Sequence, residues 1–354
     1  MNHTIDTIVC PKCKGELVTI ENKINCLSCG QSYTKHGPIP SFVNDGLYWG
    51  EISKEIMQEL LSASKIEGVY FALNKIIRNE YPDLYYYILD EKRVIPFITL
   101  LDLKNNCNAI DIGSGYGTVS LFLSKYFTKV YAVEPVKERA EFIQLISNER
   151  KRTNIEVIQA SMHQLPFTDN TFDLIVLNGV LEWAGLELIH TNPRTVQSFL
   201  LINLLKLLKP TGTLLIAIEN RISYRYFLGE LDHSGLKYTS LLPRPLANLA
   251  FHFFKKRRKH LIYESNGYRT YTYSYWGYKQ LLRRSGFAEV MIFGCYPSYY
   301  DPEVLFPFSS DFIHLISIPN NKNLSTKIFT SVMKIQLLKK CFTPAFVIVA
   351  KREI

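Results

Sequence analysis

The architecture of this chain can be inferred outward from Asn108-Ala109-Ile110-Asp111-Ile112-Gly113-Ser114-Gly115-Tyr116-Gly117. Its first five residues form a short, mostly apolar run typical of a buried strand, and alternating glycines follow immediately. Glycine adopts backbone conformations that other residues resist, so the run predicts a strand that enters a tight turn. The spacing of apolar residues over 118–126 then predicts an amphipathic helix. Taken alone, the glycine turn is a weak signal, because any tight connection between strand and helix favours glycine.

The same alternation of strand and helix continues downstream. Strands are predicted at 130–133, 155–158, 172–177, 213–218 and 345–350, and helices at 138–150 and 200–208. Strands that alternate with helices indicate a parallel sheet with both faces covered. We therefore predict an α/β fold with a doubly wound, Rossmann-like sheet.

Two carboxylates beside the glycine turn indicate its ligand. In such sheets the ligand lies outside the carboxyl ends of the strands, and Glu134 follows the second strand, where a carboxylate can hold ribose hydroxyls. The alternative for Glu134 is an exposed acid at the start of a helix, next to Pro135. Asp111 would repel a pyrophosphate but suits a cofactor with an ammonium group. The G-x-G-x-G spacing also differs from the G-x-G-x-x-G pattern of dinucleotide sites.

At these motifs the chain resembles the class I S-adenosylmethionine (SAM)-dependent methyltransferases. Residues 159–167, 172–178 and 207–215 extend the resemblance, which covers roughly 105–220 and resumes at 277–290. It implies a doubly wound methyltransferase sheet with SAM as the cofactor. The residues that the resemblance assigns to SAM are Asp111, Gly113, Ser114, Gly115, Tyr116, Gly117, Glu134, Pro135, Ser161, Met162 and Asn178. The family often places an aspartate near the adenine, and Ala160-Ser161 departs from that pattern.

Four of the seven cysteines lie near the N-terminus as two Cys-x-x-Cys pairs: Cys10, Cys13, Cys26 and Cys29. Two short loops of this kind can direct four thiolates at one tetrahedral zinc ion. Four protein ligands leave no open position, so the expected role of the zinc is structural. The alternatives are two local disulfides or a redox-active pair.

These patterns predict a zinc ribbon at 1–45, a helical linker or lid at 46–105, and a methyltransferase domain at 106–354. The last domain is expected to carry insertions at about 221–270 and 300–340. A hydrophobic content of 47% and a charged content of 21% exclude general disorder. The absence of a bilayer-length apolar run or an N-terminal leader favours a cytoplasmic location. The net charge of +9 permits an anionic partner without requiring one.

Methyl transfer requires that the acceptor be aligned and that a hydroxyl acceptor lose its proton. The candidate catalytic residues follow the fourth and fifth strands: Glu182, Asp232 and His233. An Asp-His pair in a glycine-bounded loop suits a general base with an orienting carboxylate. The alternative is a turn whose polar side chains cap a helix. His163 and His190 are expected to be bystanders.

The acceptor class is predicted with less detail. A small molecule (a sugar, saccharide intermediate or secondary metabolite) is favoured, which would make the chain a biosynthetic enzyme. Alternatives are an rRNA or tRNA methyltransferase that recognises RNA through the ribbon, a peptide or protein methyltransferase, and a SAM-binding scaffold. The basic run 255–259 could contact RNA or an anionic membrane, or it could be a solvated helix end.

Overall fold

The computed structural model describes residues 7–43, 48–101, 107–254, 267–308 and 335–352 of this chain. The basic run 255–259 lies outside the described residues, as do 309–334 of the second predicted insertion. The chain divides into two compact units. Unit 1 comprises Met1–Ile95, Leu101–Val176 and Lys206–Thr213, and unit 2 comprises Pro96–Leu100, Leu177–Leu205 and Leu214–Ile354. Since these units group the residues differently, the boundaries at 45 and 105 stay predictions.

Unit 1 contains the strands that the glycine motif predicts. They are β5 (Asn108–Ile112), β6 (Lys129–Val133), β7 (Ile155–Ile158) and the first parts of β8 (Phe172–Asn178) and β9 (Leu208–Glu219), in the order β9-β8-β5-β6-β7. Adjacent strands β5, β6 and β7 run parallel, with Ile112 opposite Val133 and Val133 opposite Ile158. Helices α5 (Thr118–Leu123) and α6 (Lys137–Glu149) alternate with these strands. The predicted doubly wound α/β fold is confirmed.

Unit 2 contains the ends of β8 and β9 together with β10 (Glu289–Pro297), β11 (Pro302–Pro307) and β12 (Ala345–Lys351). The strand order is β11-β10-β12-β9, and β10 pairs antiparallel with both β11 and β12. The described helices wholly within this unit are η3 (Leu181–Trp183), α8 (Tyr224–Phe227), η4 (Thr239–Leu241), α9 (Arg244–Phe253), α10 (Tyr275–Arg284) and α12 (Gln336–Phe342). Two further helices, α4 (Ile95–Ile98) and α7 (Pro193–Leu207), cross the division between the units.

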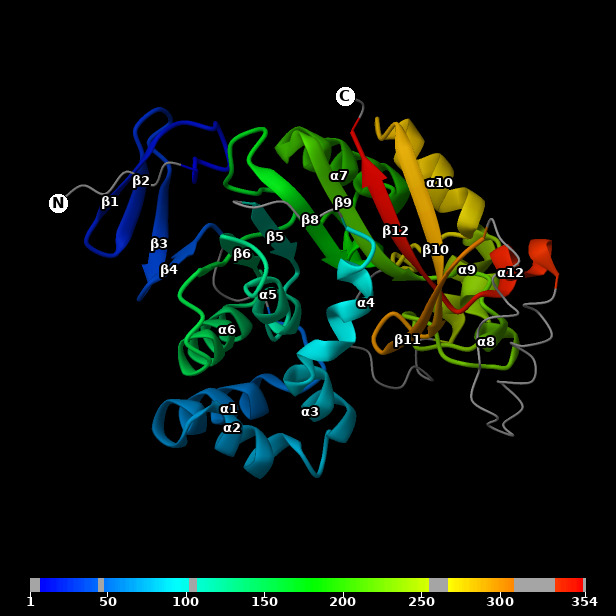
Figure 1. Cartoon of the computed structure of the whole chain (residues 1–354), viewed down its shortest axis with the longest axis horizontal. Coiled ribbons are helices and arrows are strands. Elements are labelled where there is room, and N and C mark those ends of the chain that lie inside the picture. The colour runs from blue at the N-terminus through cyan, green and yellow to red at the C-terminus, as the bar shows by residue number, and fades with distance from the viewer. Residues whose placement is uncertain (1–6, 44–47, 102–106, 255–266, 309–334, 353–354) are drawn as a thin grey trace. The chain divides into compact units, whose positions relative to one another are not determined.

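The N-terminal residues form a small antiparallel sheet. Its strands are β1 (Leu17–Ile20), β2 (Lys23–Cys26), β3 (Ser32–His36) and β4 (Ile39–Ser41), in sequence order (Figure 1). Before these strands, Ile8 makes an isolated antiparallel bridge with Phe167. Few residues of this sheet are large and buried, as expected where a metal rather than a core would hold the fold.

This small sheet continues the edge of the parallel strands in unit 1. The backbone N–H of Phe42 donates to the carbonyl of Gln159 (2.8 Å), and the N–H of Gln159 donates to the carbonyl of Pro40 (2.9 Å). The ammonium of Lys14 donates to the Leu165 carbonyl (2.9 Å). Edge strands carry unpaired backbone groups, so these bonds satisfy donors and acceptors that would otherwise face solvent. The ribbon therefore packs against the edge of the parallel strands in unit 1.

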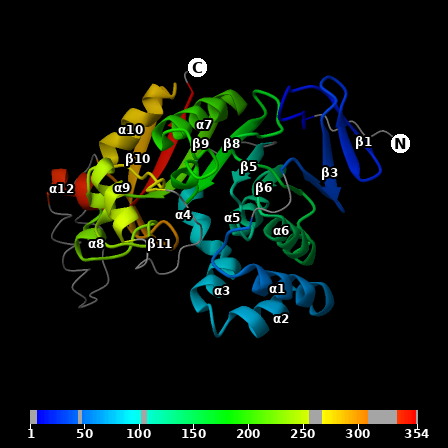
Figure 2. The ribbon, with the colours of Figure 1, turned by 180° about the vertical axis from the view of Figure 1, so that it is seen from behind.

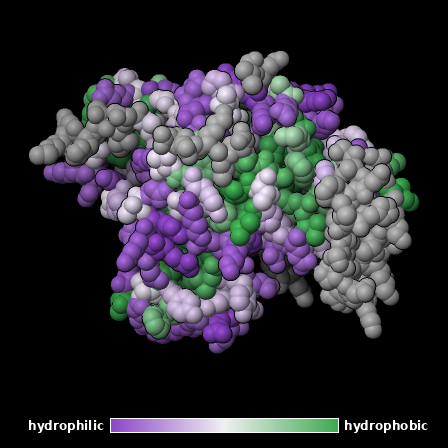
Figure 3. Space-filling model, viewed as in Figure 1, coloured by the Kyte–Doolittle hydropathy of each residue, from purple (hydrophilic) through white to green (hydrophobic). Residues whose placement is uncertain are grey.

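The segment predicted as a helical linker is helical. It contains α1 (Lys54–Glu67), α2 (Val69–Ala72), the π-helix η1 (Leu73–Ile77), α3 (Pro82–Leu89) and η2 (Glu91–Val94). Ser53 caps α1 through a hydrogen bond from the N–H of Ile56. Figure 2, like Figure 1, shows α1 and α2 beside α6, which they contact. In Figure 3 the surface over α6 is mainly hydrophilic, consistent with an amphipathic helix whose apolar residues are buried.

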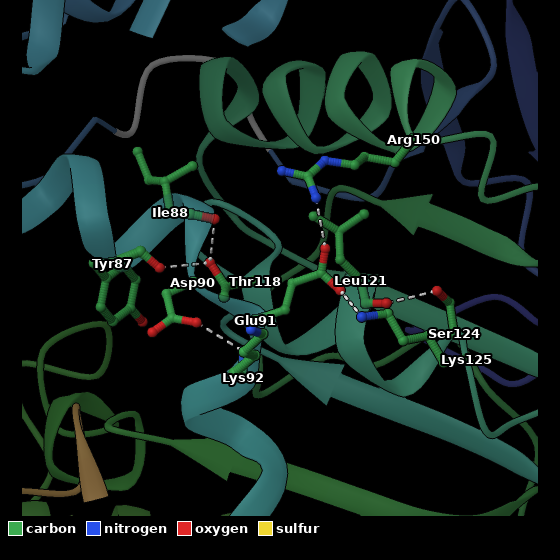
Figure 4. Close-up of polar contacts among 10 residues, drawn as sticks. All are labelled: Tyr87, Ile88, Asp90, Glu91, Lys92, Thr118, Leu121, Ser124, Lys125 and Arg150. Carbon is green, nitrogen blue, oxygen red and sulfur yellow. Dashed lines mark hydrogen bonds and ion pairs between the residues drawn. The ribbon is translucent and has the colours of Figure 1, made fainter. Parts of the chain in front are cut away.

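A buried carboxylate joins this segment to the rest of unit 1 (Figure 4). Glu91 is 6% exposed and forms ion pairs with the Arg150 guanidinium (3.0 Å) and the Lys125 ammonium (2.7 Å). Next to it, the Thr118 hydroxyl donates to the carbonyls of Tyr87 (3.0 Å) and Ile88 (3.2 Å). These contacts hold η2 and the end of α3 against α5 and α6.

Replacing Glu91 with Gln is expected to lower the free energy of unfolding by about 1–3 kcal/mol. The amide cannot pair with two cations, although Lys125 and Arg150 retain partial access to water, which limits the loss. Urea unfolding measures the change. The matched control is Glu67→Gln, because Glu67 pairs with Lys75 at an exposed site and its loss should cost less than about 0.5 kcal/mol. Equal losses in both variants would contradict the structural role of Glu91.

None of the described helices combines the length and the apolar composition that a bilayer span requires.

Candidate functional site

The glycine turn has the backbone geometry that the sequence predicts. Gly113, Gly115 and Gly117 all have positive φ angles. At Gly117 φ is +86°, and a Cβ atom would lie 3.1 Å from Cγ2 of Ile143 on α6. The N–H groups of Gly113 and Ser114 donate to the carbonyl of Val133 (2.8 and 3.0 Å). The end of β6 therefore holds the turn in place at the carboxyl end of β5.

Asp111 lies beneath this turn at the end of β5. It is 2% exposed, and its Oδ2 accepts a hydrogen bond from the Ser120 hydroxyl on α5 (2.6 Å). Burial raises the pKa of Asp111 to about 6, against the opposing effect of its hydrogen bonds. A buried carboxyl with a raised pKa gains from a nearby positive charge, which is the property that the sequence analysis assigned to Asp111.

Glu134 closes the turn from the end of β6. It is 1% exposed, and its two oxygens accept hydrogen bonds from the N–H groups of Gly115 (2.8 Å) and Val136 (3.1 Å). Burial raises its pKa to about 7, although the charge of Arg139 acts in the opposite direction. Each carboxylate oxygen has two lone pairs, so Glu134 retains acceptor capacity for hydroxyl donors. The geometry suits the ribose-binding role that was predicted for it.

Arg139 was missed by the sequence analysis. It projects from α6, is 3% exposed, and pairs with Glu51. Its guanidinium carbon lies 4.9 Å from the ring centroid of Tyr116 and 5.2 Å from that of Trp49. These contacts bind the segment before α1 to the glycine turn, and the lid at 46–105 stays a prediction. No local pattern signals this contact, because its partners are far apart in the sequence.

The remaining residues assigned to SAM lie after β6, β7 and β8. Pro135 is buried, and its carbonyl accepts a hydrogen bond from the Gln159 side chain (3.1 Å). The Ser161 hydroxyl accepts from the N–H of His163 (3.1 Å), and Met162 is buried. In unit 2, Oδ1 of Asn178 is buried and accepts no hydrogen bond from the described residues. Their roles toward SAM remain predictions.

Three titratable side chains meet in unit 2. Glu182 lies on η3, Glu219 ends β9, and His233 lies in the loop after α8. Nε2 of His233 is 2.5 Å from Oε2 of Glu219 and 3.6 Å from Oε1 of Glu182. The His233 ring also packs edge-on against Trp183, with centroids 4.7 Å apart. We call Glu182, Glu219 and His233 the acid-histidine cluster.

The side chains of the acid-histidine cluster shift one another's pKa values. Burial alone would lower the pKa of His233, but the Glu219 carboxylate, with Glu182, raises it to about 9. Burial and the neighbouring Glu219 raise the pKa of Glu182. Groups that interact this strongly gain and lose protons together, so the cluster acts as one unit.

Asp232 has a different neighbourhood from the one predicted. Its Oδ1 accepts a hydrogen bond from the N–H of Ser234 (2.8 Å), which stabilises the turn. The carboxylate that contacts His233 within hydrogen-bond distance is Glu219. The sequence indicates that Glu219 ends a strand, but it does not show that the loop returns His233 to it.

The four N-terminal cysteines lie together. Sγ atoms are 3.8 Å apart between Cys10 and Cys29 and 3.4 Å apart between Cys13 and Cys26, and all four lie within 4.8 Å of one another. A tetrahedral zinc with Zn–S bonds of about 2.3 Å requires sulfurs about 3.8 Å apart, whereas a disulfide has an S–S bond of about 2.05 Å. The thiol set therefore fits zinc rather than two disulfides.

Comparison with known proteins agrees with the interpretation of the glycine turn as part of a methyltransferase domain. Residues 110–216 match the family described as a methyltransferase domain. A ubiquinone biosynthesis O-methyltransferase of Rickettsia akari is 28% identical over 34% of this chain and 43% of its own length. An uncharacterized methyltransferase of Bacillus subtilis is 33% identical over 19% of this chain and 26% of its own. The chain spans less than half the length of either relative. A SAM-dependent methyltransferase structure from Aquifex aeolicus is 20% identical, with a TM-score of 0.37, over 58% of this chain and 85% of that one.

The fold and the glycine turn thus define a Rossmann-like α/β domain. More particularly, residues 110–216 match a family of methyltransferase domains.

Proposed function

We propose that this chain transfers a methyl group from SAM to a small-molecule acceptor such as a sugar, a saccharide intermediate or a secondary metabolite. The observation that carries methyl transfer is the glycine turn closed by Glu134 inside the methyltransferase segment. Gly113 to Gly117 and Asp111 would bind the methionine part, and Glu134 the ribose. Ser161, Met162 and Pro135 would lie near the adenosine, and Asn178 near the sulfonium.

The acid-histidine cluster supplies the proposed acceptor chemistry. Glu182 follows the carboxyl end of β8, and Glu219 is the last residue of β9. Enzymes of the α/β class bind ligands at such strand ends. Transfer of a methyl group to a hydroxyl oxygen breaks the O–H bond, and the cluster would take up the released proton as a unit. Asp232 is proposed to support the loop that carries His233.

Burial of the cluster favours a small acceptor. Glu182 is fully buried, and the side chains of Glu219 and His233 are mostly buried. The docking of the ribbon on unit 1 gives the proposed zinc a structural role that needs no RNA. We also propose that the chain acts in the cytoplasm.

Replacing His233 with Asn is expected to lower kcat for methyl transfer by roughly 10²–10⁴-fold, the usual effect of losing a proton-transfer group. Transfer of label from methyl-labelled SAM to fractionated metabolites measures turnover, and calorimetry measures SAM binding, which should change less than about twofold. His190→Asn is the control, because His190 is exposed and lies outside the cluster. Unchanged turnover in His233→Asn would exclude the cluster from the reaction. Label that enters RNA but not metabolites would exclude the small-molecule acceptor.

A further inference from the structure

Glu182 is a buried carboxylate without the hydrogen bonds that such a group requires. It is fully buried, and neither of its oxygens accepts a hydrogen bond from the residues that the structure describes. Nε2 of His233 lies 3.6 Å from Oε1, which is beyond hydrogen-bond distance. Buried charges are normally paired at close range or bound to a metal ion. An ionised Glu182 would therefore be stabilised by a cation that binds one of its oxygens directly.

Glu219 and His233 lie close enough to Glu182 to bind the same ion. One atom each from Glu182, Glu219 and His233 lies within 4.8 Å of the others. Ligands bound at about 2.0–2.2 Å to a common ion lie within roughly 4.4 Å of one another, so small side-chain adjustments would suffice. When both carboxyl groups are ionised, their two negative charges would balance a divalent cation.

We propose that the acid-histidine cluster binds a divalent metal cation through one oxygen of Glu182, one oxygen of Glu219 and Nε2 of His233. Carboxylate and imidazole ligands suit hard and intermediate cations such as Mn²⁺, in contrast to the four thiolates of the ribbon. Three protein ligands leave positions open on an ion that prefers six. An oxygen atom of an acceptor could occupy one of them.

This site goes beyond the proposed methyl transfer, because metal binding requires neither SAM nor turnover. In the metal-bound form, the cation would replace the proton that His233 and Glu219 share. An acceptor hydroxyl bound to the cation would lose its proton to water more readily, as metal-bound water does.

The test is a Mn²⁺ titration of the full zinc-loaded chain, followed by electron paramagnetic resonance of the free ion. We expect one Mn²⁺ per chain in the wild type. The Glu182→Gln variant should bind Mn²⁺ at least about 10–100-fold more weakly, because even outer-sphere changes have effects of this size. His233→Asn is the second variant, in case Glu182→Gln disturbs the fold, and should weaken binding similarly.

Glu230→Gln is the matched control. Glu230 is a nearby carboxylate that pairs with Arg225 and lies outside the cluster. Absence of Mn²⁺ binding at millimolar concentration, or equal affinity in wild type and Glu182→Gln, would overturn the proposal. So would stabilisation of the wild type by an alkylammonium ion without Mn²⁺ uptake, since the cluster would then be a site for an organic cation. Mn²⁺ binding without any methyl transfer would reject the proposed function alone.

Discussion

Replacing Glu134 with Gln is expected to weaken SAM binding by about 3 kcal/mol, or roughly 150-fold. The carboxylate is expected to accept hydrogen bonds from both ribose hydroxyls, and bonds to a charged acceptor contribute about 1.5–3 kcal/mol each. The amide has one oxygen and no charge, and its NH₂ group would face the N–H of Gly115 or Val136, which donate to Glu134 in this structure. Calorimetric titration with SAM and with S-adenosylhomocysteine measures the loss.

A pH dependence distinguishes this role from general damage to the fold. The pKa of Glu134 is raised to about 7, and ribose hydroxyls favour the ionised form. Wild-type affinity for SAM should therefore increase by up to about tenfold from pH 6 to pH 8. The Gln variant should lose the part of this dependence that Glu134 causes.

Glu156→Gln is the control for Glu134. Glu156 lies on β7, outside the glycine turn, and pairs with Lys129 near the surface. Its replacement should leave SAM affinity within about twofold of the wild type. If both variants bind SAM equally well, Glu134 does not hold the cofactor.

Replacing Cys26 with Ser is expected to remove the bound zinc and unfold the ribbon. Its four short strands bury few apolar side chains, and a structural zinc site contributes about 10–16 kcal/mol to folding. Because β4 and its neighbours bond to β7 and the loop after it, the exposed edge of unit 1 should also become more susceptible to protease. Metal analysis measures the loss of zinc. Limited proteolysis measures how readily residues 7–43 and the exposed edge of unit 1 are cleaved.

Cys341→Ser is the control for this experiment, because Cys341 lies outside the ribbon and is only partly buried. It should retain one zinc per chain and an intact ribbon. Intact-mass measurement of the wild type tests the alternative, since two disulfides would lower the mass by four hydrogens and leave no zinc. That result would contradict the zinc site.

The local chemistry of the chain made much of the fold predictable. The strand predicted before Gly113 is β5, and the helix predicted from Thr118 is α5, although it ends at Leu123, earlier than expected. The strand predicted at 345–350 is β12, whose antiparallel pairing with β10 was not predicted. A periodic pattern identifies an element, but partners and direction depend on residues distant in the sequence.

The contacts at the candidate sites likewise include some that the sequence predicted and some that it did not. The two Cys-x-x-Cys pairs predicted the convergence of four thiols, because each pair is local and zinc geometry dictates the rest. The contact between Arg139 and Glu51 was not predictable, since no rule of spacing joins α6 to the segment before α1. The role expected of Asp232 beside His233 shows the limit, because adjacent residues in a turn point to different partners.

The sequence by itself determined the strand and turn at 108–117, the carboxylates at Asp111 and Glu134, and the cysteine pairs, since each depends on interactions over a few residues or on one repeated pattern. Only the tertiary structure decided that Glu182 and Glu219 meet His233, that Arg139 holds the segment before α1, and that β4 continues the edge at β7. These contacts form because the packing of distant elements closes long loops, and the free energy of that packing is not encoded in any short stretch.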